Sequence, residues 1–184
     1  MLIAVPTGVK VFNWTATMWR GSMTFETPML FSIGFIFLFV IGGFSGVICA
    51  IVPIDIQVQE TYYVIAHFHY VLVSGALFAI FGAVYYWLPK WSGRMYDENL
   101  GKWHFWLSMF FFNLTFFVQH FLGLAGMPRR VPDYALQFAD FNMISSIGGF
   151  GFGLTQLFFL YIVIKCIRSG EKAADKPWEG GTTL

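Results

Sequence analysis

Two histidines one residue apart lie inside a long apolar run, TYYVIAHFHYVLVSGALFAIFGAVYYWLP. Histidine is the commonest metal ligand among side chains, because a neutral imidazole offers a nitrogen lone pair. In a strand, His67 and His69 would share one face and could hold one metal ion together. In a helix they would lie about 200° apart, so each would serve a different partner. The elements that carry them decide between the two cases.

Lys10 is another ionisable residue inside an apolar stretch, with Pro6 and Thr7 just before it. Thr7 precedes Lys10 by three residues, so a helix would place the hydroxyl and the amine on one face. Pro6 lacks an N–H group and leaves an upstream carbonyl free to bind water. The pattern predicts that Thr7, Lys10 and water form a path for protons. The alternative is a lysine paired with an acidic residue on a helix outside this chain.

Charged residues in two connecting segments form a third candidate site. GMPRRVPDY carries Arg129 and Arg130 side by side, and PIDIQVQETYY carries Asp55 and Glu60. Paired guanidinium groups suit carboxylates, because the planar fork can bond both oxygen atoms. An acidic residue beside a carboxylate bound there could share a proton with it. The alternative is a solvated loop with ordinary surface charges.

The composition decides which elements carry these residues. Of the 184 residues, 57% are hydrophobic and only 11% are charged, whereas about a quarter are charged in soluble proteins. Runs of 18 or more apolar residues indicate membrane-spanning helices, and lipid admits only helices or closed barrels. No period-two barrel pattern is present. We therefore predict an all-α, polytopic transmembrane helical bundle with one partial span (about 1–19), four complete spans (about 29–52, 61–89, 102–126 and 142–168) and a polar tail (169–184).

The helical assignment puts His67 and His69 on nearly opposite faces of the third span. A single histidine in a membrane helix has a simple alternative role as a core residue bonded to a neighbouring helix. Two histidines on opposite faces, next to Phe68 and Tyr70, favour ligation, because neutral imidazole is the usual axial ligand of haem iron. The pattern predicts one flat macrocycle on each side of the helix.

The basic residues set the expected orientation. We call the side reached after the first span side A, and the opposite side B. Side A carries eight basic residues and side B two, so side A is expected to be the cytoplasmic or matrix side. The eight are Arg20, Lys90, Arg94, Lys102, Lys165, Arg168, Lys172 and Lys176, and the two are Arg129 and Arg130. The polar, glycine-rich tail is expected on side A, either flexible or ordered on assembly.

Five segments together resemble the last third of subunit I of the haem–copper cytochrome c oxidases. They are PTGVKVFNW, FIFLFVIGGFSGV, ETYYVIAHFHYV, LGLAGMPRRVPDY and PWEGGTTL. AHFHYV followed by GMPRR at this separation is a specific pair of motifs, and the likeness extends over nearly the whole chain. The resemblance implies a twelve-helix subunit, of which this chain supplies the back of helix VIII and helices IX to XII.

The resemblance also implies cofactors and their ligands. His67 would be the axial ligand of a high-spin haem a, and His69 one of the two axial ligands of a low-spin haem a. Lys10 and Thr7 would belong to a proton pathway that serves the site of oxygen reduction. Phe68 would lie between the two ligands.

The resemblance further places Arg129, Arg130 and Asp55 in the region of the haem propionates. Many members of the family carry His-Asp where this chain has Gln59-Glu60, and that pair helps to bind a magnesium or manganese ion. Glu60 keeps a carboxylate, but the Gln59 amide is a poorer ligand than imidazole. The substitution weakens the expectation of a Mg or Mn site at Glu60.

Some of the family's ligands are missing. Copper B needs three histidines, from a GHPEVY-like segment and a His-His pair, and neither motif occurs here. We expect the copper ligands, and the second axial histidine of the low-spin haem, to lie outside this chain. His120 is left with a packing role and His104 with a place at the inner surface. The chain is expected to work with the N-terminal portion of subunit I, whether that is a separate polypeptide or part of one longer chain.

These implications define the predicted function. The chain would be part of a terminal oxidase that reduces O2 to water with electrons from cytochrome c and couples this to proton translocation. Oxidase subunits II and III and the lipid bilayer are the other expected partners, with no nucleic acid. The expected location is a bacterial inner membrane or, alternatively, a mitochondrial one, with the C-terminus on the cytoplasmic or matrix side.

Two alternatives remain open. A quinol oxidase of the same superfamily shares the haems, but such enzymes resemble AHFHNV and MTRR more than the AHFHYV and MPRR seen here. A non-enzymatic ion or proton transporter explains Lys10 and the spans. It gives no reason for an arginine pair on the side of the membrane nearest to the two histidines.

Overall fold

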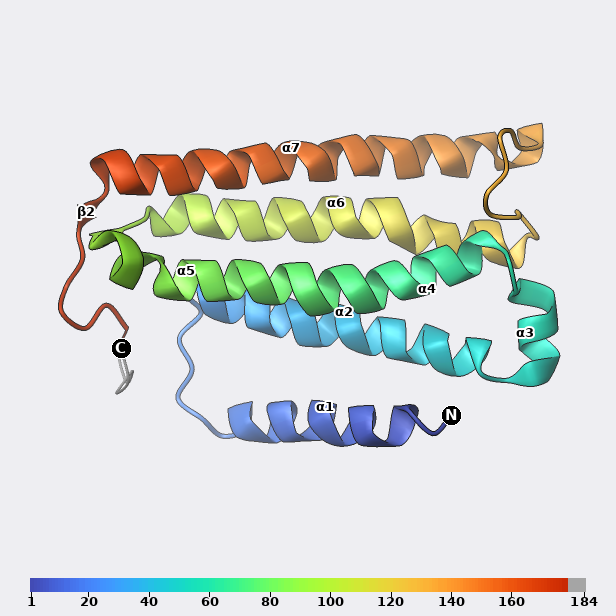
Figure 1. Cartoon of the computed structure of the whole chain (residues 1–184), viewed down its shortest axis with the longest axis horizontal. Coiled ribbons are helices and arrows are strands. Elements are labelled where there is room, and N and C mark those ends of the chain that lie inside the picture. The colour runs from blue at the N-terminus through green and yellow to red at the C-terminus, as the bar shows by residue number, and fades with distance from the viewer. Residues whose placement is uncertain (179–184) are drawn as a thin grey trace.

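The computed structural model describes residues 1–178 and consists almost entirely of helices that run side by side (Figure 1). Four helical segments are long and apolar enough to cross a membrane, and the prediction of an all-helical polytopic membrane bundle is confirmed. They are α2 (Thr27–Cys49), α4 to α5 (Tyr62–Ser92), α6 (Glu98–Leu124) and α7 (Ala139–Ser169) with the 3₁₀ turn Leu136–Phe138 before it. The remaining elements are α1 (Ala4–Met18), α3 (Val52–Val58) and the short strands β1 (Arg94–Met95) and β2 (Glu171–Lys172).

The helix ends follow local signals in the sequence. Pro28 lies in the first turn of α2, where its missing N–H group needs no partner. Asp97 caps α6, because its side chain accepts hydrogen bonds from the backbone N–H groups of Asn99 and Leu100 at 3.0 and 3.3 Å. Gly93 ends α5 with a φ of 66°, a left-handed conformation that glycine adopts without strain.

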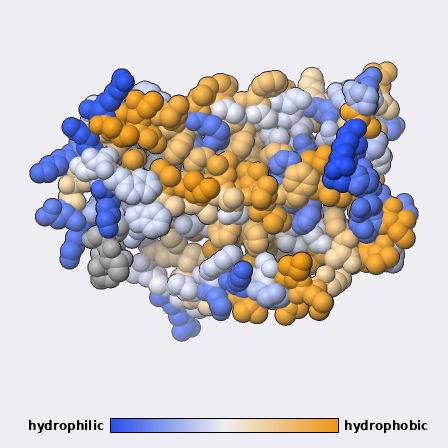
Figure 2. Space-filling model, viewed as in Figure 1, coloured by the Kyte–Doolittle hydropathy of each residue, from blue (hydrophilic) through white to orange (hydrophobic). Residues whose placement is uncertain are grey.

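The four long segments run side by side, and consecutive segments are antiparallel (Figure 1). α4 packs against both α2 and α6, α2 also contacts α6 directly, and α7 packs along α6. α1 lies apart from these four segments and packs chiefly against α2. Residues 19–26, 93–97 and 170–178 gather at one end, which is side A, and residues 50–61 and 125–138 at the other, which is side B. Hydrophilic residues gather at these two ends in the space-filling view (Figure 2).

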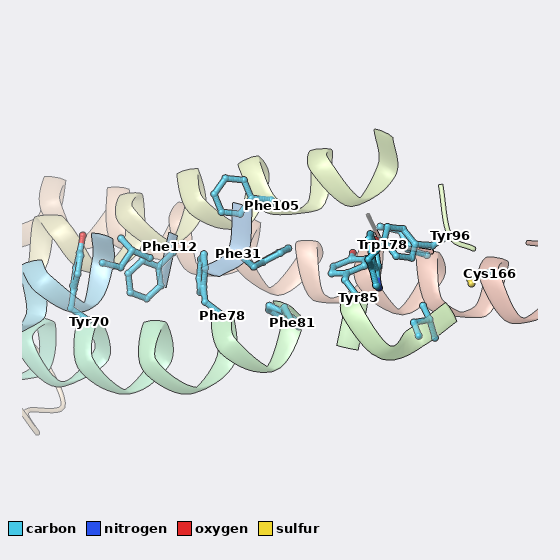
Figure 3. Close-up of a cluster of buried hydrophobic side chains, with 13 residues drawn as sticks. Phe31, Tyr70, Phe78, Phe81, Tyr85, Tyr96, Phe105, Phe112, Cys166 and Trp178 are labelled. Carbon is cyan, nitrogen blue, oxygen red and sulfur yellow. The ribbon is translucent and has the colours of Figure 1, made fainter. Parts of the chain in front are cut away.

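Buried aromatic rings hold the side-A half of the bundle together (Figure 3). Phe31 of α2 is fully buried, and its ring centroid lies 5.6 Å from that of Phe78 and 5.2 Å from that of Phe105. It stacks on Tyr85 at 5.7 Å. A Cβ atom at Gly34 would lie 2.7 Å from Phe105 Cε2, so a glycine is needed where α2 meets α6. These contacts fix α2, α5 and α6 relative to one another.

A π-helical turn, Val73–Phe78, joins α4 to α5 soon after the two histidines. Ser74 Oγ donates to the carbonyl of Tyr70 at its start. A π turn inserts one residue into a helix and so rotates the faces that follow relative to those before it. The faces of α5 are therefore offset from those of α4, although the apolar sequence predicts one uninterrupted span.

Two connecting parts of the chain have regular structure. Residues 52–58 form the short helix α3, which has Pro53 and Asp55 in its first turn, where both residue types favour helix formation. The start of the tail pairs through β2 with β1. Farther along, Trp178 is only 6% exposed, stacks on Tyr86 at 5.6 Å and donates Nε1–H to the Tyr86 carbonyl at 2.9 Å. Up to Trp178 the tail therefore packs on α5, and the rest lies outside the described residues.

Glu98 of α6 caps the N-terminus of α2 from outside that helix. Its Oε1 accepts hydrogen bonds from the backbone N–H and the Oγ1 of Thr27 at 2.6 and 2.9 Å. We expect Glu98→Ala to lower the free energy of unfolding by about 1–2 kcal/mol, because the substitution removes a charged cap. The thermal midpoint of the purified complex measures the change, with Asn99→Ala, an exposed position in the same turn, as the control. Equal midpoints for the two variants would contradict this role.

Candidate functional site

His67 points from α4 toward α2. Its Nδ1 lies 2.9 Å from the carbonyl oxygen of Gly42 and 3.0 Å from Ser45 Oγ. A Cβ atom at Gly46 would lie only 2.6 Å from His67 Cε1, so the imidazole lies directly against the backbone of α2. A glycine at position 46 is therefore a condition for the observed place of the ring.

His69 points instead toward α6. Its ring stacks on Phe116 with a centroid distance of 4.1 Å and an interplanar angle of 15°, and on Phe68 with a centroid distance of 4.4 Å. Its Nδ1 lies 2.7 Å from the carbonyl oxygen of Ile65 in the preceding turn. The two histidines of α4 thus face different neighbouring helices.

The hydrogen bonds fix the tautomer of both rings. Ser45 Oγ donates its proton to the Gly42 carbonyl at 2.8 Å, so His67 Nδ1 must be the donor toward both oxygen atoms. His69 Nδ1 faces a carbonyl and is also a donor. In a neutral imidazole the lone pair then lies on Nε2, and within residues 1–178 no hydrogen bond involves Nε2 of either ring. Both histidines therefore have the form that a metal ligand requires, with the second nitrogen held by the protein.

The charged residues of side B form a tight pair. Arg129 donates Nε–H to Glu60 Oε2 at 2.8 Å and Nη2–H to Glu60 Oε1 at 2.5 Å. The bidentate guanidinium stabilises the ionised carboxylate and lowers the pKa of Glu60, and the carboxylate raises the pKa of Arg129. The sequence placed both residues in one charged candidate site, and the family resemblance gave them different roles. The structure pairs them directly.

The other predicted side-B residues differ in their partners. Asp55 lies on α3, where the Gln59 amide, in the orientation that satisfies both groups, donates to its two carboxylate oxygens at 3.1 and 3.2 Å. Arg130 is exposed, has a φ of 60°, and forms no ion pair or hydrogen bond with residues 1–178 through its guanidinium. Of the two neighbouring arginines, Arg130 is thus the one whose guanidinium group has no partner among residues 1–178.

Lys10 and Thr7 lie together on α1, away from the histidines. Lys10 is exposed and Thr7 half-buried, three residues apart on one helix. α1 contacts α2 through Trp14, whose ring centroid lies 5.0 Å from that of Phe35. The rest of α1 presents exposed apolar side chains, including Leu2 and Phe12.

The remaining histidines lie in aromatic surroundings. His104 is at the side-A end of α6, as expected, but it is fully buried, and its Nδ1 lies 3.0 Å from the hydroxyl of Tyr85. His120 packs its ring against Tyr63 and Tyr70. Sequence reasoning did not identify the hydrogen bond from the Tyr70 hydroxyl to Asn113 Oδ1 at 2.6 Å, which links α4 to α6 next to His69. An asparagine in an apolar run was the available signal.

Comparison with known protein families shows the family to which the chain belongs. The family model described as cytochrome c and quinol oxidase polypeptide I matches residues 1–151. The chain belongs to this family. The sequence resemblance to subunit I of the haem–copper oxidases is thereby confirmed.

Similar proteins agree with the family assignment. The chain is 52% identical to a protein of Nocardia farcinica named "Probable cytochrome c oxidase subunit 1-beta" over 186 aligned residues, which cover 100% of this chain and 32% of that protein. It is 53% identical to a protein of Streptomyces avermitilis named "Putative cytochrome c oxidase subunit 1-beta", again over 100% of this chain and 33% of that one. The chain thus spans about one third of the length of these relatives.

A solved structure confirms the fold. A cryo-EM structure of a heme-copper terminal oxidase dimer matches with a TM-score of 0.70 at 21% identity, covering 79% of this chain and 27% of that one. The arrangement of the helices is therefore that of a haem–copper oxidase.

The residues present fit the haem that this family implies. Two imidazoles have Nδ1 held, and Nε2 without a partner among residues 1–178, on different sides of one helix. Small residues on α2 leave the His67 ring against backbone, and Phe68 and Phe116 flank His69 with flat surfaces. The Nε2 atoms of His67 and His69 could therefore each supply one axial bond to a haem iron, one on each side of α4.

Proposed function

We propose that this chain is the C-terminal portion of the catalytic subunit of a terminal oxidase. The complex would reduce O2 to water with electrons from cytochrome c and couple the reaction to proton translocation. The observation that carries the proposal is the pair His67 and His69, held at Nδ1 and directed to different sides of α4. A core role for these histidines would not need both Nε2 atoms free of partners within the described residues.

In this proposal His67 supplies the axial nitrogen for a high-spin haem a and His69 an axial nitrogen for a low-spin haem a. When bound, haem supplies electron transfer and a coordination position for oxygen. The carbonyl of Gly42 and the hydroxyl of Ser45 orient the first ring, and the carbonyl of Ile65 orients the second. Copper B would be bound by residues outside this chain.

The charged groups have supporting roles. Arg130, whose guanidinium is open, and Arg129, which keeps Nη1 free of Glu60, would neutralise haem propionates. Asp55 would lie at the same side-B end of the bundle as the two arginines. Lys10 and Thr7 on one face of α1 would pass protons from side A toward the site of oxygen reduction.

The partners follow from the surface and from the missing ligands. The exposed apolar side chains of α1 would be covered by the N-terminal portion of subunit I. Subunits II and III and cytochrome c would complete the assembly. Its place would be a bacterial inner membrane with side A, which carries eight of the basic residues, on the cytoplasmic side.

The electron donor is tested with the intact complex purified through this chain. We expect oxygen consumption with reduced cytochrome c and none above background with reduced quinol. Consumption with quinol alone would instead favour a quinol oxidase of the same superfamily. A complex that consumes no oxygen with either donor and contains no haem would favour an ion or proton transporter.

A further inference from the structure

The two side-B connections meet in a short backbone pairing that holds Glu60 beside Arg129. Thr61 and Pro128 form an isolated antiparallel bridge, and Arg129 N donates to the carbonyl of Glu60 at 3.0 Å. Glu60 has a φ of 59°, in the left-handed region that residues with a side chain seldom adopt. Such a conformation persists only where the surroundings determine it, so the backbone at Glu60 is held by the fold.

The Glu60 carboxylate already binds a cation, the Arg129 guanidinium. Both of its oxygens accept hydrogen bonds from the Arg129 guanidinium, in the planar arrangement that gives the strongest arginine–carboxylate pairs. The Arg129 side chain is only 18% exposed, whereas that of Glu60 is 55% exposed. A divalent ion bound at the same carboxylate would lie against the positive charge of Arg129, and the two would repel.

The neighbouring groups do not complete a site for a divalent ion. The Gln59 amide donates to Asp55 in the orientation that satisfies both groups, so the Asp55 carboxylate also has a partner. Magnesium and manganese favour several carboxylate or carbonyl oxygens around one point, and Gln59 brings no imidazole. Within residues 1–178 no three His, Cys, Asp or Glu side chains come together as a metal site. The donor set does not fit the ion that the family resemblance implies.

We propose that Glu60 is the fixed counter-ion of Arg129 and not a ligand of magnesium or manganese, so that Glu60 positions Arg129 and joins the two side-B connections without a metal. This proposal rests on the proposed function, because the haems near the side-B connections are part of that function. Glu60 acts through Arg129 and is a positioning residue, not a catalytic one.

Manganese content tests the metal half of the proposal. The complex is purified from cells grown with excess manganese and examined by electron paramagnetic resonance and metal analysis. We expect no bound manganese that depends on Glu60, so the native complex and Glu60→Gln have equal content. One manganese per complex that Glu60→Gln removes would overturn the proposal. The native measurement stands by itself, since a native complex without manganese supports the proposal even if the variant does not assemble.

The midpoint potentials of the haems test the positioning half. Glu60→Gln leaves the charge of Arg129 without a counter-ion, which favours the reduced haem and raises the potential. If Glu60 instead held a divalent ion, the substitution would release two positive charges with one negative charge, and the potential would fall. Asp133→Asn is the matched control, because Asp133 is an exposed acid of the side-B connection that carries Arg129 and accepts a hydrogen bond from the backbone N–H of Tyr134. A fall in potential, or an equal rise in the control, would overturn the proposal.

The two proposals fail in different ways. A complex that contains no haem would contradict the proposed function, while its manganese content would still decide whether Glu60 binds a metal. A complex with both haems and a Glu60-dependent manganese ion would leave the oxidase function intact and remove only this inference.

Discussion

His69→Ala is expected to remove the low-spin haem from the complex, and His67→Ala the haem that binds carbon monoxide. Each ring supplies an Nε2 lone pair to one side of α4, and alanine offers no replacement for the lost bond. Loss of outer partners of a metal ligand already costs roughly 10- to 100-fold, so removal of the ligand itself should lower oxygen reduction by at least about 100-fold. Reduced-minus-oxidised spectra, with and without carbon monoxide, measure which haem is lost.

His120→Ala is the matched control for both variants. His120 is also an imidazole inside the bundle, but its ring packs between Tyr63 and Tyr70, and its Nδ1 bonds to the Phe117 carbonyl. We expect this variant to keep both haem bands. If all three variants lost the same band, or if none of them lost one, the assignment of ligands to His67 and His69 would be wrong.

Gly46→Ala is expected to displace the His67 ring although His67 itself is unchanged. The added Cβ would lie 2.6 Å from His67 Cε1, closer than nonbonded carbon atoms approach, so the ring must move. The hydrogen bonds of Nδ1 to Gly42 and Ser45 would then be lost or bent. A misplacement of about 1 Å can cost on the order of 100-fold in rate, so we expect turnover to fall by roughly 10- to 100-fold.

The control lies three residues away on the same helix. A Cβ atom at Gly43 would meet nothing within 4 Å apart from its chain neighbours and the backbone of its own helix, so Gly43→Ala adds the same methyl group without a clash. We expect Gly46→Ala to alter the carbon monoxide difference spectrum and to leave the low-spin band unchanged. Gly43→Ala should match the native complex in both the difference spectrum and the low-spin band. Equal spectra for the two variants would mean that His67 does not need its observed place against α2.

The membrane spans could be predicted because each is an uninterrupted apolar run bounded by polar or turn-forming residues. The 29–52 and 102–126 predictions correspond to α2 and α6 within a few residues. The HxH motif could be placed on a helix by the same argument, and the helical period then directs the two rings apart. These conclusions depend on local composition and on the period of one helix.

The structure also contains features that no local pattern encodes. The π turn at Val73–Phe78 lies in a run as apolar as its surroundings, and a backbone bulge leaves no trace in such a sequence. The pairing of Arg129 with Glu60, and the capping of α2 by Glu98, join residues about 70 positions apart. Such contacts depend on how the helices pack, so the sequence placed Arg129 and Glu60 in one charged region but did not predict that they bind each other.

The haem content of the native complex, purified through this chain from its own membrane, tests the central claim most directly. Haem extraction, a reduced-minus-oxidised spectrum and a carbon monoxide difference spectrum would be recorded on one preparation. The account predicts two haems of type a for each copy of the chain, of which one binds carbon monoxide and the other does not. A complex with no haem, or with a single haem, would contradict the claim that α4 supplies a ligand to each of two haems.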